Sequence, residues 1–233
     1  MGYEVVLAGT RQIEGVKSLI TNTIAFIPLT HTLEGIDALI FTSAYAIRSL
    51  IESASHNLQN TPSYNPLLAR WKEIPSFVIS PASAQILYEQ GAVVEFVGKK
   101  AQGEAFAYEI CPLLQGRKAL YLRAKEIVSG LGSILKDAHI CLDEAIVYEN
   151  LPQTLPPHLK PKPQSVIIFS APSAYKSFVK NFGWESQYIA VAMGQSTFKH
   201  FDKHITAYIS PSANFNACIA FAKELARSQK NKD

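Results

Sequence analysis

Short apolar runs alternate with amphipathic stretches along nearly the whole chain. Apolar runs of this length predict buried strands, and apolar positions spaced three or four apart predict helices. Ten strands are predicted, over residues 3–8, 23–28, 37–41, 76–80, 93–97, 118–122, 139–142, 165–169, 188–193 and 205–209. Helices are expected between most of them, for example over 44–53, 83–89, 104–114 and 215–226. This alternation predicts an α/β fold built on parallel sheets that are buried on both faces. Ten strands divide naturally into two sheets of five.

A weak internal repeat indicates two similar domains. The segment LIFTSAYAIRSL (39–50) aligns with IIFSAPSAYKSF (167–178), and FVISPASAQIL (77–87) aligns with AVAMGQSTFKHF (190–201). The repeat is carried mostly by the hydrophobic pattern, because few residues are identical.

The first copy of the repeat continues where the second has ended. Residues 118–142 have no partner downstream, and their best partner is the segment 3–27. The sequence therefore predicts one continuous α/β domain, residues 33–148, and one discontinuous α/β domain, residues 1–32 with 149–233. The chain would cross between them near Thr30–Gly35 and near Tyr148–Pro163, where five prolines favour an extended linker.

Composition narrows the class of protein. Hydrophobic residues make up 48% of the 233 residues and charged residues 18%, as is typical of a globular protein. A net charge of +3 is too mild to indicate nucleic-acid binding, and the apolar runs fall far short of a membrane span. Three dispersed cysteines, with no secretion signal at the start of the chain, favour a cytoplasmic protein without disulfides. In the absence of a large apolar stripe, we expect a monomer.

Common cofactor and metal motifs are missing from the sequence. It contains no GxGxxG after a strand, no GxxxxGK[ST], no GxSxG and no HExxH. His200 and His204 would share one helix face, but without a third ligand nearby they are better interpreted as surface histidines. We therefore expect neither a cofactor nor a metal.

Hydroxyl side chains recur where predicted strands give way to helices. Plain helix capping explains each of them singly. As a set they would lie at the carboxyl ends of parallel strands, where ligands bind, and free backbone N–H groups there suit carboxylates or phosphates. The candidate ligand-binding residues are Thr10, Thr42, Ser43, Ser80, Ser83, Ser170, Ser173, Gly194, Ser196 and Thr197.

Three further residues are candidates for the site. Arg11 and Arg123 stand at equivalent strand ends of the two copies, where each either binds an anion or is a solvated surface arginine. Tyr148 precedes the proline-rich crossing. Its phenol could hydrogen-bond a ligand or donate a proton, or the ring could simply pack at the domain junction.

Ordered segments over almost the whole chain resemble the uroporphyrinogen-III synthase family of tetrapyrrole biosynthesis. They are FTSAYAI (41–47), VISPASAQIL with GAVVEFVG (78–98), ALYLRAKEIVSGL with CLDEAIVYEN (119–150), VIIFSAPSAYKSF (166–178), and VAMGQSTFKHF with ISPSANFNACIAFAKEL (191–225).

The resemblance implies two α/β domains joined by a two-stranded connector, with the active site in the cleft between them. It implies an enzyme, a lyase, that needs no cofactor or metal. Its substrate would be hydroxymethylbilane, a linear tetrapyrrole with many acidic side chains. The enzyme would close the ring with loss of water and invert ring D, giving uroporphyrinogen III for haem biosynthesis. By the same resemblance Tyr148 matches the connector tyrosine of the family and is the candidate catalytic residue, while Thr197 and Ser83 match hydroxyl positions.

The chain departs from the family pattern at several turns. Ser80, Ala124 and Gln195 stand where the family usually has Gly, Gly and Pro, and Ser83 replaces a Thr. An alternative of a different class uses the same features, namely a non-catalytic two-domain sensor that binds a small anionic ligand.

Overall fold

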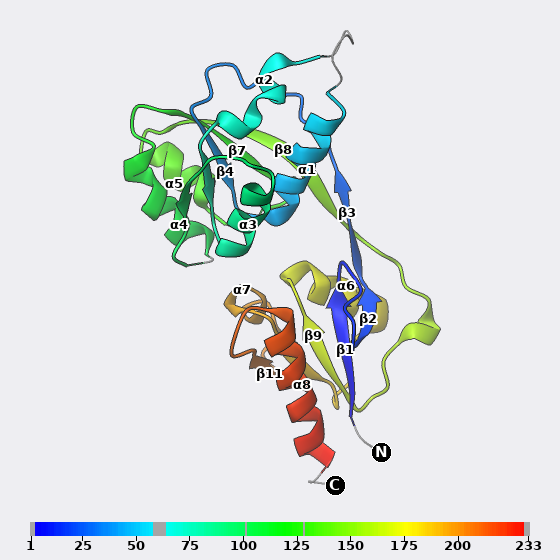
Figure 1. Cartoon of the computed structure of the whole chain (residues 1–233). Coiled ribbons are helices and arrows are strands. Elements are labelled where there is room, and N and C mark those ends of the chain that lie inside the picture. Colours follow the sequence, from blue (N-terminus) through cyan, green and yellow to red (C-terminus); the bar gives the residue numbers. More distant parts are fainter. Residues whose placement is uncertain (1–2, 58–63, 101, 128, 231–233) are drawn as a thin grey trace. The chain divides into compact units, whose positions relative to one another are not determined.

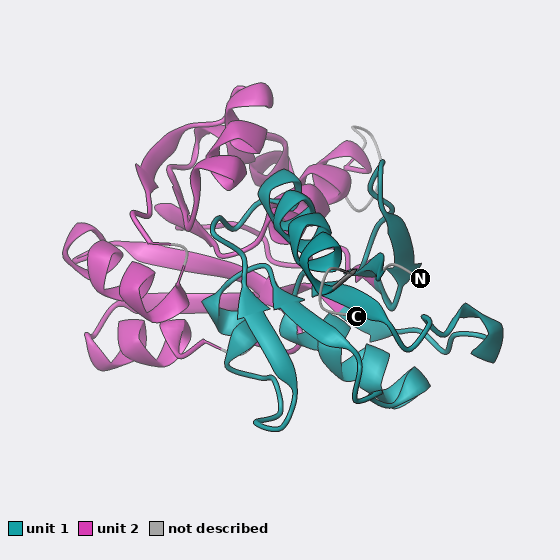
Figure 2. Cartoon of the chain, turned by 90° about the horizontal axis from the view of Figure 1, so that it is seen from below, with its two compact units in different colours: residues 1–23, 150–233 teal, residues 24–149 magenta. Residues whose placement is uncertain are grey.

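The computed structural model describes residues 3–57, 64–100, 102–127 and 129–230 (Figure 1). The chain folds into two compact units, unit 1 with residues 1–23 and 150–233 and unit 2 with residues 24–149 (Figure 2). Both boundaries fall inside strands, β3 (Asn22–Phe26) and β8 (Cys141–Pro152), which are neighbours in one sheet. The sequence pattern had placed the first crossing further along the chain, near Thr30–Gly35.

Unit 1 is built on a five-stranded sheet in the order β11-β10-β9-β1-β2, in which each neighbouring pair is parallel. The strands are β1 (Glu4–Gly9), β2 (Lys17–Ile20), β9 (Ser165–Phe169), β10 (Ile189–Ala192) and β11 (Thr206–Ile209). The helices are η3 (Pro157–Leu159), α6 (Pro172–Phe182), α7 (Gln195–Phe198) and α8 (Phe215–Lys230).

The central strands of unit 1 are apolar on both faces because helices cover both. Ile167 and Phe169 of β9 pack with α6 in an aromatic core, whereas Val166 and Ile168 pack with α8. Alternate residues of a strand point to opposite faces, so a strand between two helical layers must be apolar throughout.

Unit 2 is built on a six-stranded sheet in the order β3-β8-β7-β4-β5-β6. Besides β3 and β8, its strands are β4 (Ala38–Phe41), β5 (Ser76–Val78), β6 (Val94–Val97) and β7 (Lys118–Ala124). From β8 to β6 the neighbours are parallel. The helices are α1 (Ala44–Ser55), α2 (Pro66–Ala69), η1 (Trp71–Glu73), α3 (Pro81–Glu89), α4 (Gly103–Ile110), η2 (Cys111–Leu113) and α5 (Leu131–Asp137).

The sheet of unit 2 is likewise covered on both faces. Leu39 and Phe41 of β4 pack with α1 and α3 on one face, and Ala38 and Ile40 pack with α4 and α5 on the other. The same alternation in β7 puts Tyr121 on the α4–α5 face, where only 1% of it is exposed.

The predicted α/β fold with parallel sheets is confirmed, but the division into two sheets of five is wrong. The described part of the chain holds five strands in one sheet and six in the other. The sequence pattern missed β2, because a four-residue edge strand with one buried side chain leaves almost no apolar run. It also ended β8 at residue 142, although the strand continues to Pro152 through a stretch in which only Val147 is fully buried.

Candidate functional site

In unit 2 the candidate residues gather at the carboxyl ends of four adjacent parallel strands, β8, β7, β4 and β5. Parallel strands end at the same edge of a sheet, and this is the edge at which α/β proteins bind ligands. Thr42 and Ser43 follow β4, and Ser80 and Ser83 follow β5. Arg123 and Tyr148 belong to the neighbouring strands β7 and β8.

Tyr148 is half-buried beside the first turn of α1. A register shift between Arg123 and Ala124 sets Tyr148 opposite Ala124, and such bulges redirect side chains near functional sites. Its ring lies 5.8 Å from the ring of Tyr45, centroid to centroid. Burial raises the pKa of Tyr148, and a side-chain hydrogen bond with Ser43 offsets part of that rise. The phenol therefore keeps its proton at neutral pH.

Ser43 can serve Tyr148 and α1 at once. Its Oγ accepts a hydrogen bond from the Tyr45 N–H at 3.1 Å and so caps the helix. Its own hydroxyl proton is left to point at the Tyr148 oxygen, since a serine hydroxyl both donates and accepts. In that arrangement the Tyr148 proton is free to face a ligand.

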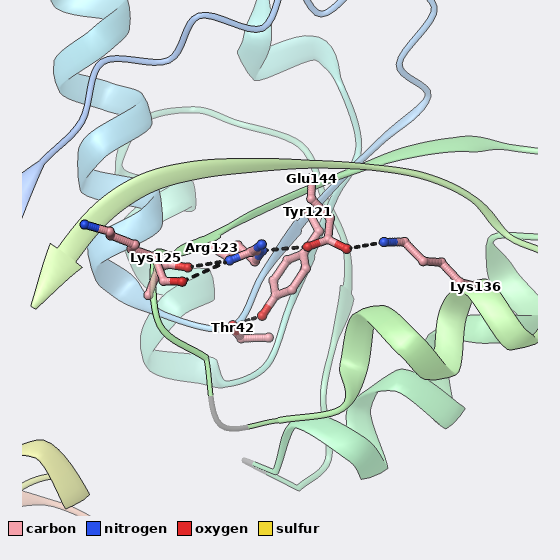
Figure 3. Close-up of polar contacts among 7 residues, drawn as sticks. Thr42, Tyr121, Arg123, Lys125, Lys136 and Glu144 are labelled. Carbon is pink, nitrogen blue, oxygen red and sulfur yellow. Dashed lines mark hydrogen bonds and ion pairs between the residues drawn. The ribbon is translucent and has the colours of Figure 1, made fainter.

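Thr42 is hydrogen-bonded to a second tyrosine, Tyr121. Its Oγ1 lies 2.9 Å from the hydroxyl of Tyr121, and Figure 3 shows the two side chains meeting at the end of the strands. Burial raises the pKa of Tyr121, and side-chain hydrogen bonds with Thr42 and Ser129 lower it in part. Two adjacent residues, Thr42 and Ser43, thus contact two different tyrosines.

Ser80 and Ser83 act together at the start of α3. Ser80 caps the helix by accepting from the Ser83 N–H at 3.3 Å, and its hydroxyl donates to Ser83 Oγ at 3.1 Å. Only 4% of Ser83 is exposed. The capping interpretation therefore holds at this turn, with the hydroxyls largely engaged by each other.

Arg123 is neither a solvated arginine nor a free anion site. Its Nε donates to Glu144 at 2.6 Å, and its Nη1 donates to the carbonyls of Ala124 and Lys125 (Figure 3). Glu144 also binds Lys136 at 2.6 Å. Burial raises the pKa of Glu144, but the hydrogen bonds and charges of Lys136 and Arg123 outweigh it and lower the pKa overall.

In unit 1 the candidate residues follow the adjacent strands β1, β9 and β10. Arg11 is exposed, with its guanidinium 4.7 Å from the centre of the Phe215 ring. Thr10 precedes it and is half-buried. Ser170 donates a long hydrogen bond of 3.4 Å to the carbonyl of Ala8. A Cβ on Gly9 would lie 2.7 Å from Ser170 Oγ, so glycine allows this close approach.

The remaining candidates of unit 1 differ in exposure. Ser173, in the first turn of α6, accepts a hydrogen bond from the Asn150 amide at 3.0 Å. Gly194 precedes α7 in an extended conformation without a side-chain cap. Ser196 is exposed, whereas Thr197 is 2% exposed. The structure thus brings these hydroxyls to one sheet edge, but it largely buries Thr197.

Two residues of the unit 2 site were missed by the sequence analysis. Tyr121 lies in the apolar run ALYL, which looks like core in any α/β protein. Glu144 is 21 residues from Arg123, and only the β7–β8 register brings them together. The signal for Glu144 was a charged residue within a strand, but the strand was predicted to end before it.

The described ranges contain neither a metal-binding cluster nor a helix that could span a membrane. No group of three or more His, Cys, Asp or Glu side chains there could hold a metal ion. Cys111, Cys141 and Cys218 are free. No helix of the described residues has the length and apolar character needed to cross a membrane.

The fold defines a two-unit α/β protein with hydroxyl-bearing turns at the carboxyl ends of its parallel strands. The family model of uroporphyrinogen-III synthase HemD matches residues 6–220. The chain therefore belongs to the uroporphyrinogen-III synthase family, and it is an enzyme.

Solved structures agree with this assignment. Uroporphyrinogen-III synthetase from Helicobacter pylori is 34% identical, with a TM-score of 0.79, over 96% of this chain and 99% of that one. A mutant uroporphyrinogen III synthase from Thermus thermophilus is 14% identical, with a TM-score of 0.66, over 97% and 99%, and it supports the fold alone. None of the curated proteins compared with the chain matches it.

Proposed function

We propose that the chain is a lyase that closes hydroxymethylbilane to uroporphyrinogen III, releasing water and inverting ring D. The observation that carries this proposal is the match of the family model along residues 6–220. The 34% identity to the Helicobacter pylori protein, which is named a uroporphyrinogen-III synthetase, supports it.

Tyr148 is the proposed proton donor to the leaving hydroxyl. An electron-rich pyrrole expels that hydroxyl with little help, so one weak acid suffices and the enzyme chiefly positions its substrate. The raised pKa of Tyr148 keeps the phenol protonated at neutral pH. When the C–O bond breaks, the Tyr148 proton completes the departing water, and the phenolate is stabilised by the Ser43 hydroxyl.

The hydroxyl-bearing turns are the proposed contacts for the acidic side chains of the substrate. Ser43 and Ser80 stand at helix starts in unit 2, and Ser173 and Ser196 stand in the first turns of helices in unit 1, where backbone N–H groups suit carboxylates. The Thr42 hydroxyl is bonded to Tyr121, and Thr10 lies between β1 and β2 rather than at a helix start. Arg11 is the exposed cation at the unit 1 edge. Arg123 is bonded to Glu144, so it would bind substrate only by exchanging that partner.

Three further predictions accompany this function without bearing on its test. They are a cytoplasmic location, a monomeric state, and catalysis without cofactor or metal. Size-exclusion chromatography with light scattering would measure the mass in solution, to be compared with 25.7 kDa for one chain.

A coupled assay tests the proposed function. Hydroxymethylbilane is generated in situ, the protein is added, and the uroporphyrin isomers are separated after oxidation. Isomer III in excess over the spontaneous isomer I is expected. Isomer I alone, from a sample shown to be folded by circular dichroism, would contradict the proposal and favour the sensor alternative.

A further inference from the structure

The Tyr121 hydroxyl is a buried polar group in an otherwise apolar layer. Tyr121 is 1% exposed and packs among Ile40, Phe106 and Leu131 on the α4–α5 face. Burying a phenol oxygen is unfavourable unless the oxygen is hydrogen-bonded, and a phenylalanine would fill the same space without that requirement. The partners of the hydroxyl therefore indicate what it does.

The hydrogen-bonded partner lies in a turn at the carboxyl ends of the strands. Thr42 Oγ1 is 2.9 Å from the Tyr121 hydroxyl, in the turn between β4 and α1. That turn continues into Ser43, whose Oγ accepts from the Tyr45 N–H at 3.1 Å, and the Tyr45 ring lies 5.8 Å from the Tyr148 ring, centroid to centroid. One buried hydroxyl thus holds the turn from which the start of α1 packs beside the proposed proton donor.

We infer that Tyr121 is a positioning residue, which fixes the Thr42–Ser43 turn and so holds Ser43 against the Tyr148 phenol. The inference rests on the proposed function, in which Tyr148 gives up its proton. Tyr121 is too deeply buried to touch substrate, so its effect passes through Thr42 and Ser43. In its absence the turn gains freedom, and the Tyr148 hydroxyl is no longer held in one direction.

The first experiment compares kinetic constants of the full chain in the coupled assay. Tyr121→Phe should lower kcat about 10-fold, since small misplacements of a reacting group are costly, and should leave KM within about twofold. Thr42→Val should do the same. The kcat of the double variant should be no lower than that of either single variant, because both substitutions break the same Thr42–Tyr121 hydrogen bond.

Tyr188→Phe is the matched control. Tyr188 is also fully buried, and its hydroxyl donates to the Pro161 carbonyl at 2.8 Å in unit 1. It precedes β10, whereas the candidate residues Gly194, Ser196 and Thr197 follow the other end of that strand. It should lower the unfolding midpoint without lowering kcat. An unchanged kcat in Tyr121→Phe, or losses that multiply in the double variant, would overturn the inference.

A second readout needs no substrate. Tyrosines labelled at ring carbon ζ are titrated by NMR, with the Tyr148 signal assigned from its loss in Tyr148→Phe. In Thr42→Val the pKa of Tyr148 should rise further, because the Ser43 hydroxyl no longer stabilises its phenolate. Tyr121→Phe is left out of this readout, since it also removes the Tyr121 charge that raises the pKa of Tyr148. If Tyr121→Phe fails to fold, Thr42→Val alone carries the kinetic comparison, since it removes the other partner of the same hydrogen bond.

The two readouts separate the two proposals. If the wild type forms only isomer I, the proposed function fails, while the NMR titration of Thr42→Val still tests the coupling of the Thr42–Tyr121 hydrogen bond to Tyr148. If the wild type forms isomer III but the pKa of Tyr148 is the same in Thr42→Val as in the wild type, the positioning role is wrong and the function stands.

Discussion

At the scale of single residues, the site depends on two hydroxyls that are adjacent in the sequence. Thr42 and Ser43 point to different phenols, Tyr121 and Tyr148. Neighbouring side chains at the start of a helix diverge, so one turn can contact two strands. This arrangement leaves one phenol sealed in the core and the other half-exposed beside it.

The first prediction concerns the half-exposed phenol. Tyr148→Phe should lower kcat about 10²-fold, the usual loss when a general acid is removed. The fold should persist, because the ring keeps its contacts with Tyr45 and the core. Steady-state kinetics and a thermal unfolding curve measure the two effects separately.

Tyr108→Phe is the control for this substitution. Tyr108 lies on α4 in the same unit and is 67% exposed, so loss of its hydroxyl should change neither rate nor stability. An unchanged kcat in Tyr148→Phe would remove Tyr148 from the mechanism and leave proton donation to another group.

The sequence indicated which turns carry the candidate residues, but not their partners. A hydroxyl residue that follows an apolar run can be recognised in the sequence alone, so Ser43 and Ser80 could be proposed. In the structure both residues cap helices. The pairing of Arg123 with Glu144 depends on strand register, which the sequence alone does not give. Tyr121 was not recognised, because a tyrosine within a continuous apolar strand is interpreted as part of the hydrophobic core.

At the scale of secondary-structure elements, Glu144 links three of them. Its carboxylate on β8 contacts Arg123 of β7 and Lys136 of α5. Both Arg123 and Glu144 have side chains 19% exposed, so water screens this pair less than a surface pair. The Glu144 carboxylate therefore helps to fix the position of α5 relative to β7 and β8.

The second prediction is the pH dependence of that link. The pKa of Glu144 is lower in the folded chain than in the unfolded chain. Its contribution is therefore fully present above the ordinary pKa of about 4.3 and is lost as the pH falls through the lowered value. Glu144→Gln should cost about 1–2 kcal/mol of unfolding free energy at pH 7 and progressively less as the pH falls through the lowered pKa of Glu144.

Urea unfolding at several pH values measures this difference. Glu73→Gln is the control, because Glu73 pairs with Arg70 at the surface, where the ions are exposed. Its effect on the midpoint should be small at every pH. If Glu144→Gln lowered the unfolding free energy equally at acid and neutral pH, the charge of Glu144 would not be what stabilises the fold.

The third prediction concerns a close approach between elements of unit 2. Gly98 follows β6, and a Cβ there would lie 2.9 Å from the Ile79 carbonyl oxygen and 2.9 Å from Phe106 Cδ2. The carbonyl belongs to the backbone and cannot easily give way. Gly98→Ala should therefore destabilise the chain by about 2 kcal/mol.

Gly130→Ala is the comparison for Gly98→Ala. Its nearest neighbour would be 4.0 Å from the new Cβ, and its φ of −77° suits any residue. Because alanine reduces the freedom of the unfolded chain, Gly130→Ala should leave the stability unchanged or raise it slightly. Equal losses in the two variants, measured by chemical unfolding, would contradict the steric explanation.

The sequence missed β2 and ended β8 too early, although β6 and β11, which have no buried residue, were predicted to within one residue. The pattern identified β4, β9 and β10, where every residue is buried, to within a residue or two. β2 has one buried residue, and β8 has one in twelve, Val147. Such strands are defined by their hydrogen-bonded neighbours, which local hydrophobicity does not record.

At the scale of the whole molecule, the two units differ in how the chain supplies them. Unit 2 is one continuous segment, residues 24–149, whereas unit 1 combines residues 1–23 with 150–233. The early segment brings β1, which lies between β9 and β2 in the sheet of unit 1. β1 pairs with β9 at five positions, from Glu4 with Ser165 to Ala8 with Phe169.

The last prediction follows from this division. A fragment of residues 22–152, which keeps β3 and β8 whole, should fold alone and unfold cooperatively in urea, because both of its helical layers are present. A fragment of residues 150–233 should not, since β9 would lose β1 and expose an apolar edge. Adding a peptide of residues 1–23 should restore a cooperative transition, measured by circular dichroism. Cooperative folding of 150–233 by itself would show that β1 is dispensable, and failure of 22–152 would show that the units fold only together.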